Sequence, residues 1–239
     1  MKPFVKYFLF FFLFTSHCLA QVTFQKSYSV SSGAAGISGI VTNDGGYIIA
    51  GLTYSTGTVG SDVYLIKTDS LGNIQWSKTY GTAVDEFAYA ISQTFDGGYV
   101  LGCYKYASVS SSDFLLMKVD AMGNLLWSKK YNNGGGDDHI QSVIQTADSG
   151  FIMIGNTTNV VPCCRSDIYV VKTDINGNLL WSKTYQGSDG YEFGMSIEQT
   201  TDGGFILSGS RDNTGAGPFY IWLIKVNASG NKIWERTYG

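Results

Sequence analysis

Histidine, proline and charged residues are scarce in this sequence of 239 residues. It contains two His and three Pro, and charged side chains make up 15% of it. One histidine, His17, lies near the N-terminus and the other is His139, so the sequence has no Cys/His constellation of the kind that binds zinc. The formal net charge of −3 offers no basic field that would attract nucleic acid or an anionic membrane. We therefore expect no metal site and no nucleic-acid partner.

The sequence also lacks the short motifs that carry common enzyme chemistry. There is no Gly-x-Ser-x-Gly elbow and no phosphate-binding loop of the Gly-x-x-x-x-Gly-Lys type. Beyond the first twenty residues, His139 is the only histidine that could serve as a base. We therefore predict no catalytic residue, no cofactor and no enzyme activity.

Long apolar runs are absent apart from residues 8–14, FLFFFLF. This run is too short to span a bilayer, which takes about 20 apolar residues. Two lysines precede it, and small residues stand at Cys18 and Ala20, so the first 20 residues read as a signal peptide cleaved after Ala20. The mature chain, 21–239, contains no transmembrane segment, and we expect a secreted or cell-surface protein. The alternatives are a periplasmic protein and an outer-membrane lipoprotein modified at Cys18.

Cysteine is rare, and three cysteines remain once Cys18 leaves with the signal. An odd number cannot pair completely within one exported chain. Cys103 occupies a position that glycine holds in related segments, which predicts a small buried residue. Cys163 and Cys164 are adjacent in a variable loop, where they would either form a vicinal disulfide or remain thiols.

Glycine (30 residues) and aromatic residues (15%) are abundant, and they recur in a fixed order. Each of four copies has an Asp-Gly-Gly-type turn, a strand containing lysine, a Gly-Asn turn and a tryptophan. These landmarks are Asp44, Asp96, Asp148 and Asp202; Lys67, Lys118, Lys172 and Lys225; Gly72, Gly123, Gly177 and Gly230; and Trp76, Trp127, Trp181 and Trp234. Spacings of 51 to 54 residues indicate propeller blades or another stacked array.

Each copy is predicted to form four strands. The first precedes the Asp-Gly-Gly turn, as in 88–94 and 195–200, and the glycines allow a tight hairpin there. The second strands are expected at 47–51, 99–102, 151–155 and 205–209, the third at 62–69, 113–120, 167–174 and 220–227, and the fourth at 74–80, 125–131, 179–185 and 232–238. The second and third strands are apolar on both alternating faces, as strands buried between two neighbouring sheets require.

The predicted fold is all-β, a β-propeller-type array of four four-stranded blades that forms an incomplete or partial ring. The expected blade units are approximately 30–81, 82–132, 133–186 and 187–239. A spare outer strand at 22–28 precedes them, because Phe24 to Tyr28 matches Trp76 to Tyr80 position for position. Either the chain is part of a longer protein whose final blade is missing, which we favour, or it is a complete four-blade unit with a spare strand.

The repeated units, DGGYIIAG, DVYLIKTD and GN-x-x-W-S-K-T-Y-G, resemble the β-propeller-type repeats of secreted Bacteroidetes proteins. The resemblance covers residues 22–239. It implies a propeller fold and an extracellular or envelope location, but no reaction. Such proteins often carry a C-terminal sorting domain for type IX secretion, and nothing like it occurs in this sequence.

Residues that do not repeat are the better candidates for function, because the scaffold does not explain them. The repeated Asp, Lys and Trp residues are interpreted as structural, with the lysine stems lying over apolar surface between blades. The acidic loop 132–139 lacks the strict spacing of a calcium loop and is interpreted as a solvated loop. The loops between second and third strands differ most between copies, which is typical of recognition surfaces on a rigid scaffold. The candidate recognition residues in them are Tyr54, Tyr104, Tyr106, Arg165, Arg211 and Phe219.

These observations predict a secreted, non-enzymatic repeat protein that serves as a binding or structural module at or outside the cell envelope. Its partner would be a protein or a glycan. The alternative is a fragment of a larger propeller enzyme, a quinoprotein-like dehydrogenase or a hydrolase, whose active site lies in missing blades. The adjacent Cys163 and Cys164 resemble the vicinal disulfide of many quinoprotein dehydrogenases.

The leader prediction is tested by the mass of the exported chain. Because small residues flank the predicted cleavage site, the mature protein should begin at Gln21. Intact-mass measurement of the chain recovered from an exporting host should give residues 21–239. A mass that retains Cys18 with an attached lipid would contradict this prediction and favour the lipoprotein.

Overall fold

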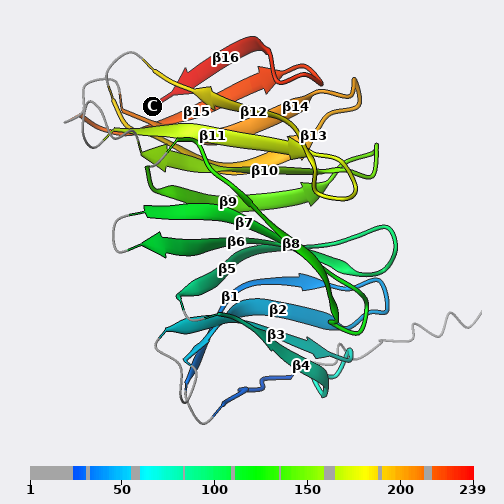
Figure 1. Cartoon of the computed structure of the whole chain (residues 1–239). Coiled ribbons are helices and arrows are strands. Elements are labelled where there is room, and N and C mark those ends of the chain that lie inside the picture. The colour runs from blue at the N-terminus through cyan, green and yellow to red at the C-terminus, as the bar shows by residue number, and fades with distance from the viewer. Residues whose placement is uncertain are drawn as a thin grey trace, which may run out of the picture.

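The computed structural model describes residues 24–30, 33–54, 60–82, 84–108, 111–134, 136–158, 165–187, 190–212 and 217–239. Within these ranges the chain forms sixteen strands and no helix, so none of the described residues builds a helix that could cross a membrane. The strands form four four-stranded antiparallel sheets, which we call blades 1 to 4 (Figure 1). This confirms the predicted all-β array of four four-stranded blades.

Each blade takes four consecutive strands in chain order. Blade 1 contains β1 (Ala34–Val41), β2 (Tyr47–Tyr54), β3 (Ser61–Thr68) and β4 (Ile74–Tyr80). Blade 2 contains β5 (Glu86–Gln93), β6 (Tyr99–Ser108), β7 (Ser111–Val119) and β8 (Leu125–Tyr131). Blade 3 contains β9 (Asp138–Gln145), β10 (Phe151–Thr158), β11 (Ser166–Thr173) and β12 (Leu179–Tyr185). Blade 4 contains β13 (Glu192–Gln199), β14 (Phe205–Arg211), β15 (Tyr220–Val226) and β16 (Lys232–Tyr238).

The Asp-Gly-Gly-type turn joins the first two strands of each blade. In blade 1, Gly45 has a φ of 78°, a conformation that glycine adopts without a steric penalty. The amide of Gly46 donates a hydrogen bond to Asp44 Oδ1 (3.0 Å). A Cβ on Gly46 would lie 2.1 Å from the carbonyl oxygen of Thr68, so this position requires glycine. The turn therefore sets the register of the hairpin through both of its glycines.

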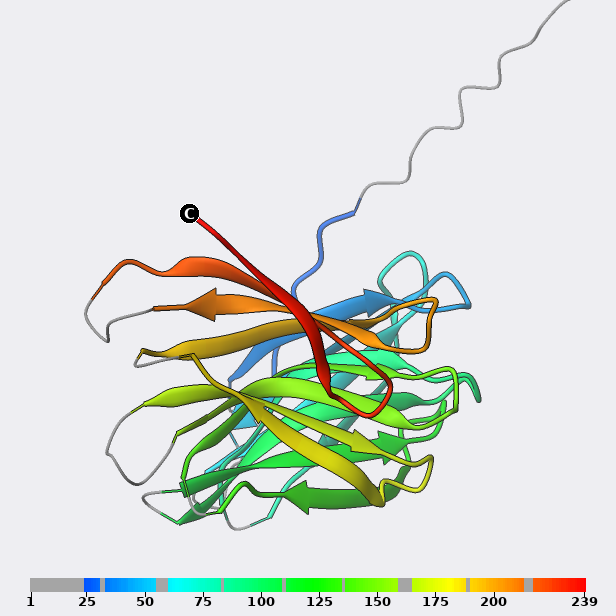
Figure 2. The same ribbon diagram turned by 90° about the horizontal axis from the view of Figure 1, so that it is seen from above.

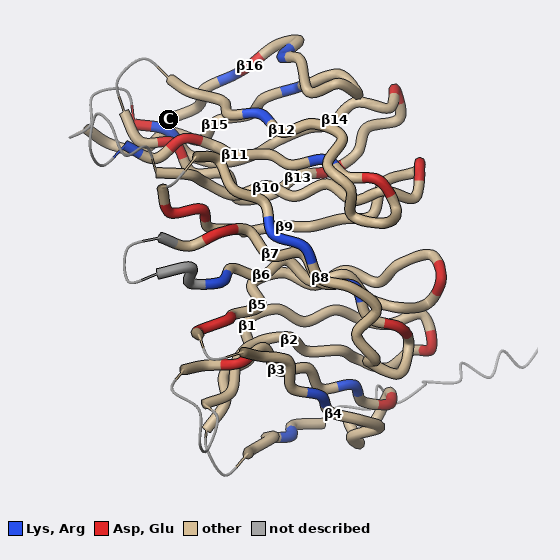
Figure 3. Tube along the Cα trace, in the orientation of Figure 1, with Lys and Arg blue, Asp and Glu red and all other residues tan. Residues whose placement is uncertain are grey.

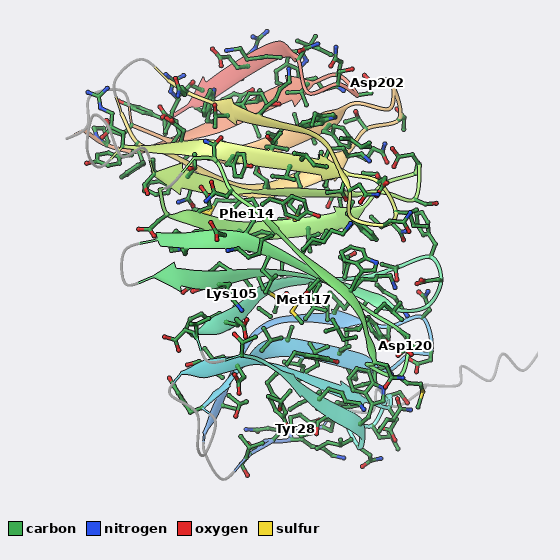
Figure 4. All side chains as sticks on the ribbon, viewed as in Figure 1. Tyr28, Lys105, Phe114, Met117, Asp120 and Asp202 are labelled. Carbon is green, nitrogen blue, oxygen red and sulfur yellow. The ribbon has the colours of Figure 1, made fainter. Side chains whose placement is uncertain are left out.

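The hydrophobic core consists of three layers, one between each pair of neighbouring blades. Strand β7 shows why the second and third strands are apolar on both faces: Met117 packs in the layer toward blade 1, and Phe114 in the layer toward blade 3 (Figure 4). Both residues are almost completely buried. A blade thus has no core of its own and depends on its neighbours for burial.

The first strands of the blades lie closest to one another. Strand β5 contacts both β1 and β9, and β9 contacts β13. Blades 1 and 4 form the two ends of a curved stack, and the view from above shows the blades turning relative to one another (Figures 1 and 2). The array of described blades is therefore an open partial ring, as predicted.

Side chains of the fourth strands of blades 1 to 3 contact the turn of the next blade. The Tyr80 hydroxyl donates a hydrogen bond to the carbonyl of Gly123 (2.5 Å), and a Cβ on Gly123 would lie 2.8 Å from the Trp76 ring. Equivalent tyrosines donate to Gly177 and Gly230 of the following blades. The glycines are needed here because each leaves room for an indole ring against the turn.

Residues 24–28 occupy the same place against blade 1, although they form no strand. The Tyr28 hydroxyl donates to the carbonyl of Gly72 (2.7 Å), and Lys26 Nζ donates to Asn73 Oδ1 (2.6 Å). The Phe24 ring lies over Gly72 as the tryptophan rings lie over later glycines. The segment therefore has the position of a fourth strand, as its sequence predicted, but not the strand conformation. The described residues include no third strand that could pair with it.

Replacing Ser149 with glycine should stabilise the protein. Ser149 occupies the position of Gly45 in blade 3 with a φ of 66°, a left-handed conformation that strains residues with a Cβ. Relief of this strain, less the added flexibility of the unfolded chain, should raise the free energy of unfolding by roughly 0.5–1 kcal/mol. The reciprocal change Gly97→Ser, at an uncrowded position, should lower it similarly. Equilibrium denaturation of both variants measures the effect, and a destabilised S149G would contradict it.

Candidate binding surface

The two ends of each blade form two chemically different rims. We call the end with the Asp-Gly-Gly-type and Gly-Asn turns the turn rim. We call the opposite end, where the first strands begin and the second strands end, the variable rim. Figure 4 shows Asp120 and Asp202 on the turn rim and Lys105 on the variable rim, and Figure 3 shows charged residues gathered at both.

On the turn rim, the repeated charges neutralise one another within each blade. Lys67 Nζ lies 2.8 Å from Asp44 Oδ2 and also donates a hydrogen bond to the carbonyl of Thr68. The hydrogen bond from Lys67 holds the pKa of the Asp44 carboxyl well below its usual range. The equivalent pairs are Lys118–Asp96, Lys172–Asp148 and Lys225–Asp202. The structural interpretation of these acids agrees with this geometry, and the sequence did not indicate that the lysine amino groups would pair with them.

On the variable rim, the charges differ from blade to blade. In blade 2, Glu86 pairs with Lys105 across two strands, and Asp113 lies 2.5 Å from Lys130 Nζ. In blade 3, threonine replaces the basic partner on the second strand. This variation leaves some buried carboxylates on the rim with fewer partners than others.

Tyr104 is the centre of an aromatic cluster between blades 2 and 3. Its ring centroid lies 5.0 Å from that of Phe87, 5.2 Å from that of Tyr89 and 5.0 Å from that of His139. These distances suit tilted ring packing, which adds to the stability gained from burial. Burial lowers the pKa of His139, so the neutral imidazole is favoured within the cluster. Tyr104 itself is buried. The three rings around it are half-buried and form the solvent-facing edge of the cluster.

A second group of side chains occupies the variable rim of blade 4. The Arg211 guanidinium lies 4.8 Å from the Trp222 ring centroid, within the range of a cation–π interaction. Arg211 is also the cross-strand partner of Glu192. The Phe219 ring lies 5.7 Å from that of Phe193. Phe219 remains 54% exposed, so this group combines a held cation with an accessible aromatic face.

The six residues predicted for recognition fall into three groups. Tyr54 and Phe219 are exposed, with 55% and 54% of their surfaces accessible, and Arg165 is exposed beside β11. Tyr104 and Arg211 lie within strands, where they support the two side-chain groups described above. The side chain of Tyr106 lies outside the described part of the structure. The structure therefore places these residues on one rim without bringing all of them into one site.

The structure settles one of the cysteine predictions. Cys103 is fully buried in the layer between blades 1 and 2, as predicted, and burial raises the pKa of its thiol above the usual range. Cys163 and Cys164 lie outside the described residues, so the choice between a disulfide and thiols stays a prediction. Within the described ranges, no group of three His, Cys, Asp or Glu side chains could hold a metal ion.

Sequence reasoning missed a β-bulge in the first strand of every blade. The pairing register shifts by one residue at Ile37, Tyr89, Gln141 and Met195. The backbone feature is repeated while the side chain changes in each blade, and bulges re-aim side chains near binding sites in many proteins. A run of small and apolar residues gives no bulge signal in the sequence, because the alternation of one strand does not reveal an extra residue relative to its partner.

Two buried carboxyl groups of the variable rim have an oxygen with no hydrogen-bond partner. These oxygens are Asp138 Oδ1 and Glu192 Oε1. Burial raises the pKa of Asp138 to about 6 and that of Glu192 to about 7, with nearby Asp113 and Asp167 adding to the respective shifts. The ionised forms are disfavoured because burial removes them from water. Asp138 and Glu192 therefore titrate closer to neutral pH than ordinary carboxyl groups do.

Known proteins resemble the chain in structure only distantly. No known protein-family profile matches it, and no curated protein matches its sequence. A Synechocystis apocarotenoid oxygenase variant is 16% identical over 84% of this chain and 48% of its own length, with a TM-score of 0.48. An endo-arabinase from Bacteroides thetaiotaomicron is 13% identical over 90% and 85% of the two chains, with a TM-score of 0.47. A putative exo-β-1,3-galactanase from Bifidobacterium bifidum is 11% identical over 81% and 68%, with a TM-score of 0.49. The chain thus spans about half the length of the oxygenase.

The two raised pKa values predict that the protein loses stability as pH rises toward neutrality. Because the folded-state pKa values exceed the ordinary values of 3.8 and 4.5, the native state binds more protons than the unfolded state between about pH 4 and pH 7. This contribution is fully present below the unfolded pKa values. The lowered pKa of His139 acts in the opposite direction, because the unfolded state binds more protons at that site. The free energy of unfolding should therefore fall by a net amount on the order of 1–3 kcal/mol between pH 5 and pH 8.

Urea denaturation at a series of pH values measures this dependence. Asp138→Asn and Glu192→Gln should each flatten the profile, because neither amide titrates. The matched control is Glu198→Gln, which changes an exposed acid on β13, the strand that also carries Glu192. Profiles as steep as that of the parent protein in both test variants would contradict the assignment.

Proposed function

We propose that this chain is a secreted, non-enzymatic repeat protein that binds a protein or a glycan through the variable rim, at or outside the cell envelope. The carrying observation is the separation of the two rims. Repeated polar residues on the turn rim bind one another in each blade, as the four Lys–Asp pairs do. Side chains that differ between blades gather at the opposite rim, where rigid strands hold them.

The accessible aromatic rings support recognition of a partner surface. Tyr54 and Phe219 expose over half of their surface at the ends of blade strands. Exposed aromatic side chains supply large contact areas with little loss of conformational entropy, which suits both protein and carbohydrate surfaces. The contact of half-buried Arg211 with Trp222 and the Tyr104 cluster stiffen the strands that carry them.

Secretion and the family resemblance belong to the same proposal. The N-terminal signal pattern and the resemblance of the repeats to those of secreted Bacteroidetes proteins support an extracellular or envelope location. An exported module with a preformed surface would act by binding alone, with its blades as a rigid support.

The proposal is tested by screening the mature chain against a glycan array and against envelope and extracellular protein fractions. For any partner found, the double variant Tyr54→Ala with Phe219→Ala should weaken binding by roughly tenfold or more, as truncation of central aromatic residues does in other interfaces. Phe95→Ala is the matched control, because Phe95 is 71% exposed on the turn rim. Its affinity should stay within about twofold of the parent value.

Two results would overturn the proposal. One is equal loss of binding in the Phe95→Ala control, which would place the interface on the turn rim. The other is turnover of a sugar or alcohol substrate by the purified chain, with or without added quinone. Turnover abolished by Cys163→Ser or Cys164→Ser would favour the dehydrogenase alternative.

A further inference from the structure

The two ends of the blade stack expose side chains that are buried everywhere else in the array. In blade 4, Ile221 is 60% exposed, while the equivalent residues of blades 1 to 3, Val63, Phe114 and Ile168, are fully buried. Each of those three residues lies in the core layer between its own blade and the following blade. The face of blade 4 that carries Ile221 therefore lacks the neighbour that the same face of every other blade has.

Blade 1 exposes the opposite half of the same kind of layer. Ile49 is only half-buried, while its equivalents Leu101, Met153 and Leu207 are fully buried. Ile49 and Tyr64 line a hollow between blade 1 and the segment 24–28. Trp222 is the equivalent of Tyr64 in blade 4. It is fully buried, whereas Tyr64 is only half-buried. Blade 1 thus presents the surface that in blades 2 to 4 receives the preceding blade.

The outer strand β16 shows the same lack of a neighbour. Trp234 is 38% exposed, and its ring faces the guanidinium of Arg236 at 5.8 Å rather than the glycine of a following turn. Tyr238 is exposed, while Tyr131 and Tyr185 at the same position donate hydrogen bonds to glycine carbonyls of the next blade. A turn of the Gly72–Asn73 type would complete these contacts.

Such a turn exists on blade 1, where residues 24–28 occupy it. Lys26 and Tyr28 hold this segment through Asn73 and Gly72. The segment forms no strand, so side-chain contacts rather than a ladder of backbone hydrogen bonds retain it. Strand β16 carries Trp234, Arg236 and Tyr238 at the spacing of Phe24, Lys26 and Tyr28, so it has the side chains to replace the segment.

We infer that copies of this chain associate head to tail, with the exposed face of blade 4 of one copy packed against the exposed face of blade 1 of the next. In this contact β16 displaces residues 24–28, and Tyr238 and Arg236 donate to Gly72 and Asn73 of the second copy. The partner is a second copy because the two faces are the complementary halves of a layer that the chain already forms three times. Apolar burial would drive the association, and the contact is heterologous, so each copy uses two different surfaces.

Sedimentation velocity of the mature chain over a wide concentration range tests the inference. The parent protein should show species larger than the monomer that increase with concentration. Ile221→Glu blocks the blade 4 face and Ile49→Glu blocks the blade 1 face, because each buries a charge in the contact. Each variant alone should be monomeric. An equimolar mixture should form a dimer and nothing larger, because one intact face of each kind remains.

Ile233→Glu is the matched control. Ile233 lies on β16 next to Trp234 and is exposed, as its equivalents Leu126 and Leu180 are even within the array. This variant should associate like the parent protein. Circular dichroism and thermal melting of every variant establish that the blades are folded before association is compared.

The role of residues 24–28 has its own test. The double variant Lys26→Ala with Tyr28→Phe loosens the segment without changing either face of the contact, so it should strengthen association by several-fold. A monomeric parent protein at all concentrations would overturn the inference, as would a mixture of the two blocked variants that stays monomeric. Weaker association of the loosened variant would overturn the displacement of residues 24–28.

Discussion

The aromatic side chains of the fourth strands β4, β8 and β12 pack against the glycine of the next blade's turn, and the rest of the array depends on this contact. Trp127 and Tyr131 show the two parts of it: the indole covers Gly177, and the hydroxyl donates to the carbonyl of the same glycine. A Cβ on Gly177 would lie 2.8 Å from the indole ring, so the spacing between blades exists only because the turn contains glycine. Once the outer edges are fixed in this way, the apolar faces of neighbouring blades meet and form the core layers. The stability of each blade is therefore shared with its neighbours.

Most of the fold followed from repetition in the sequence, because recurring turns and two-sided apolar strands fit few architectures. The burial of Cys103 followed from its alignment with glycines. The sequence did not reveal the bulge at Gln141, since an unpaired residue depends on the register of two strands rather than on the pattern of one. It also did not reveal that Tyr104 would sit in an aromatic cluster, because its neighbour His139 comes from another blade. The hydrogen bonds from the fourth-strand tyrosines to the next blade join residues 43 to 46 positions apart, where local patterns carry no information.

The two rims divide the requirements of folding and binding. Residues such as Lys172 and Asp148 recur because every blade needs the same closed ion pair, and this pairing leaves them little capacity for a ligand. The variable rim has no such common requirement, so blade 3 can hold Asp138 without the basic partner that Glu86 has in blade 2. The buried acids contribute pH sensitivity, while exposed rings such as Phe219 contribute accessible surface. At the ends of the stack, apolar side chains that the other blades bury against a neighbour, such as Ile221, are exposed.

Hydrogen exchange of the monomeric chain, measured strand by strand, tests the dependence of each blade on its neighbours most directly. Amides of β6, β7, β10 and β11 have a blade on both sides and should exchange slowest. Amides of β15 and β16 have an open face and should exchange faster, since local opening there exposes less apolar surface. Equal protection in all four blades would contradict the account, because it would mean that each blade is stable without the layers between them.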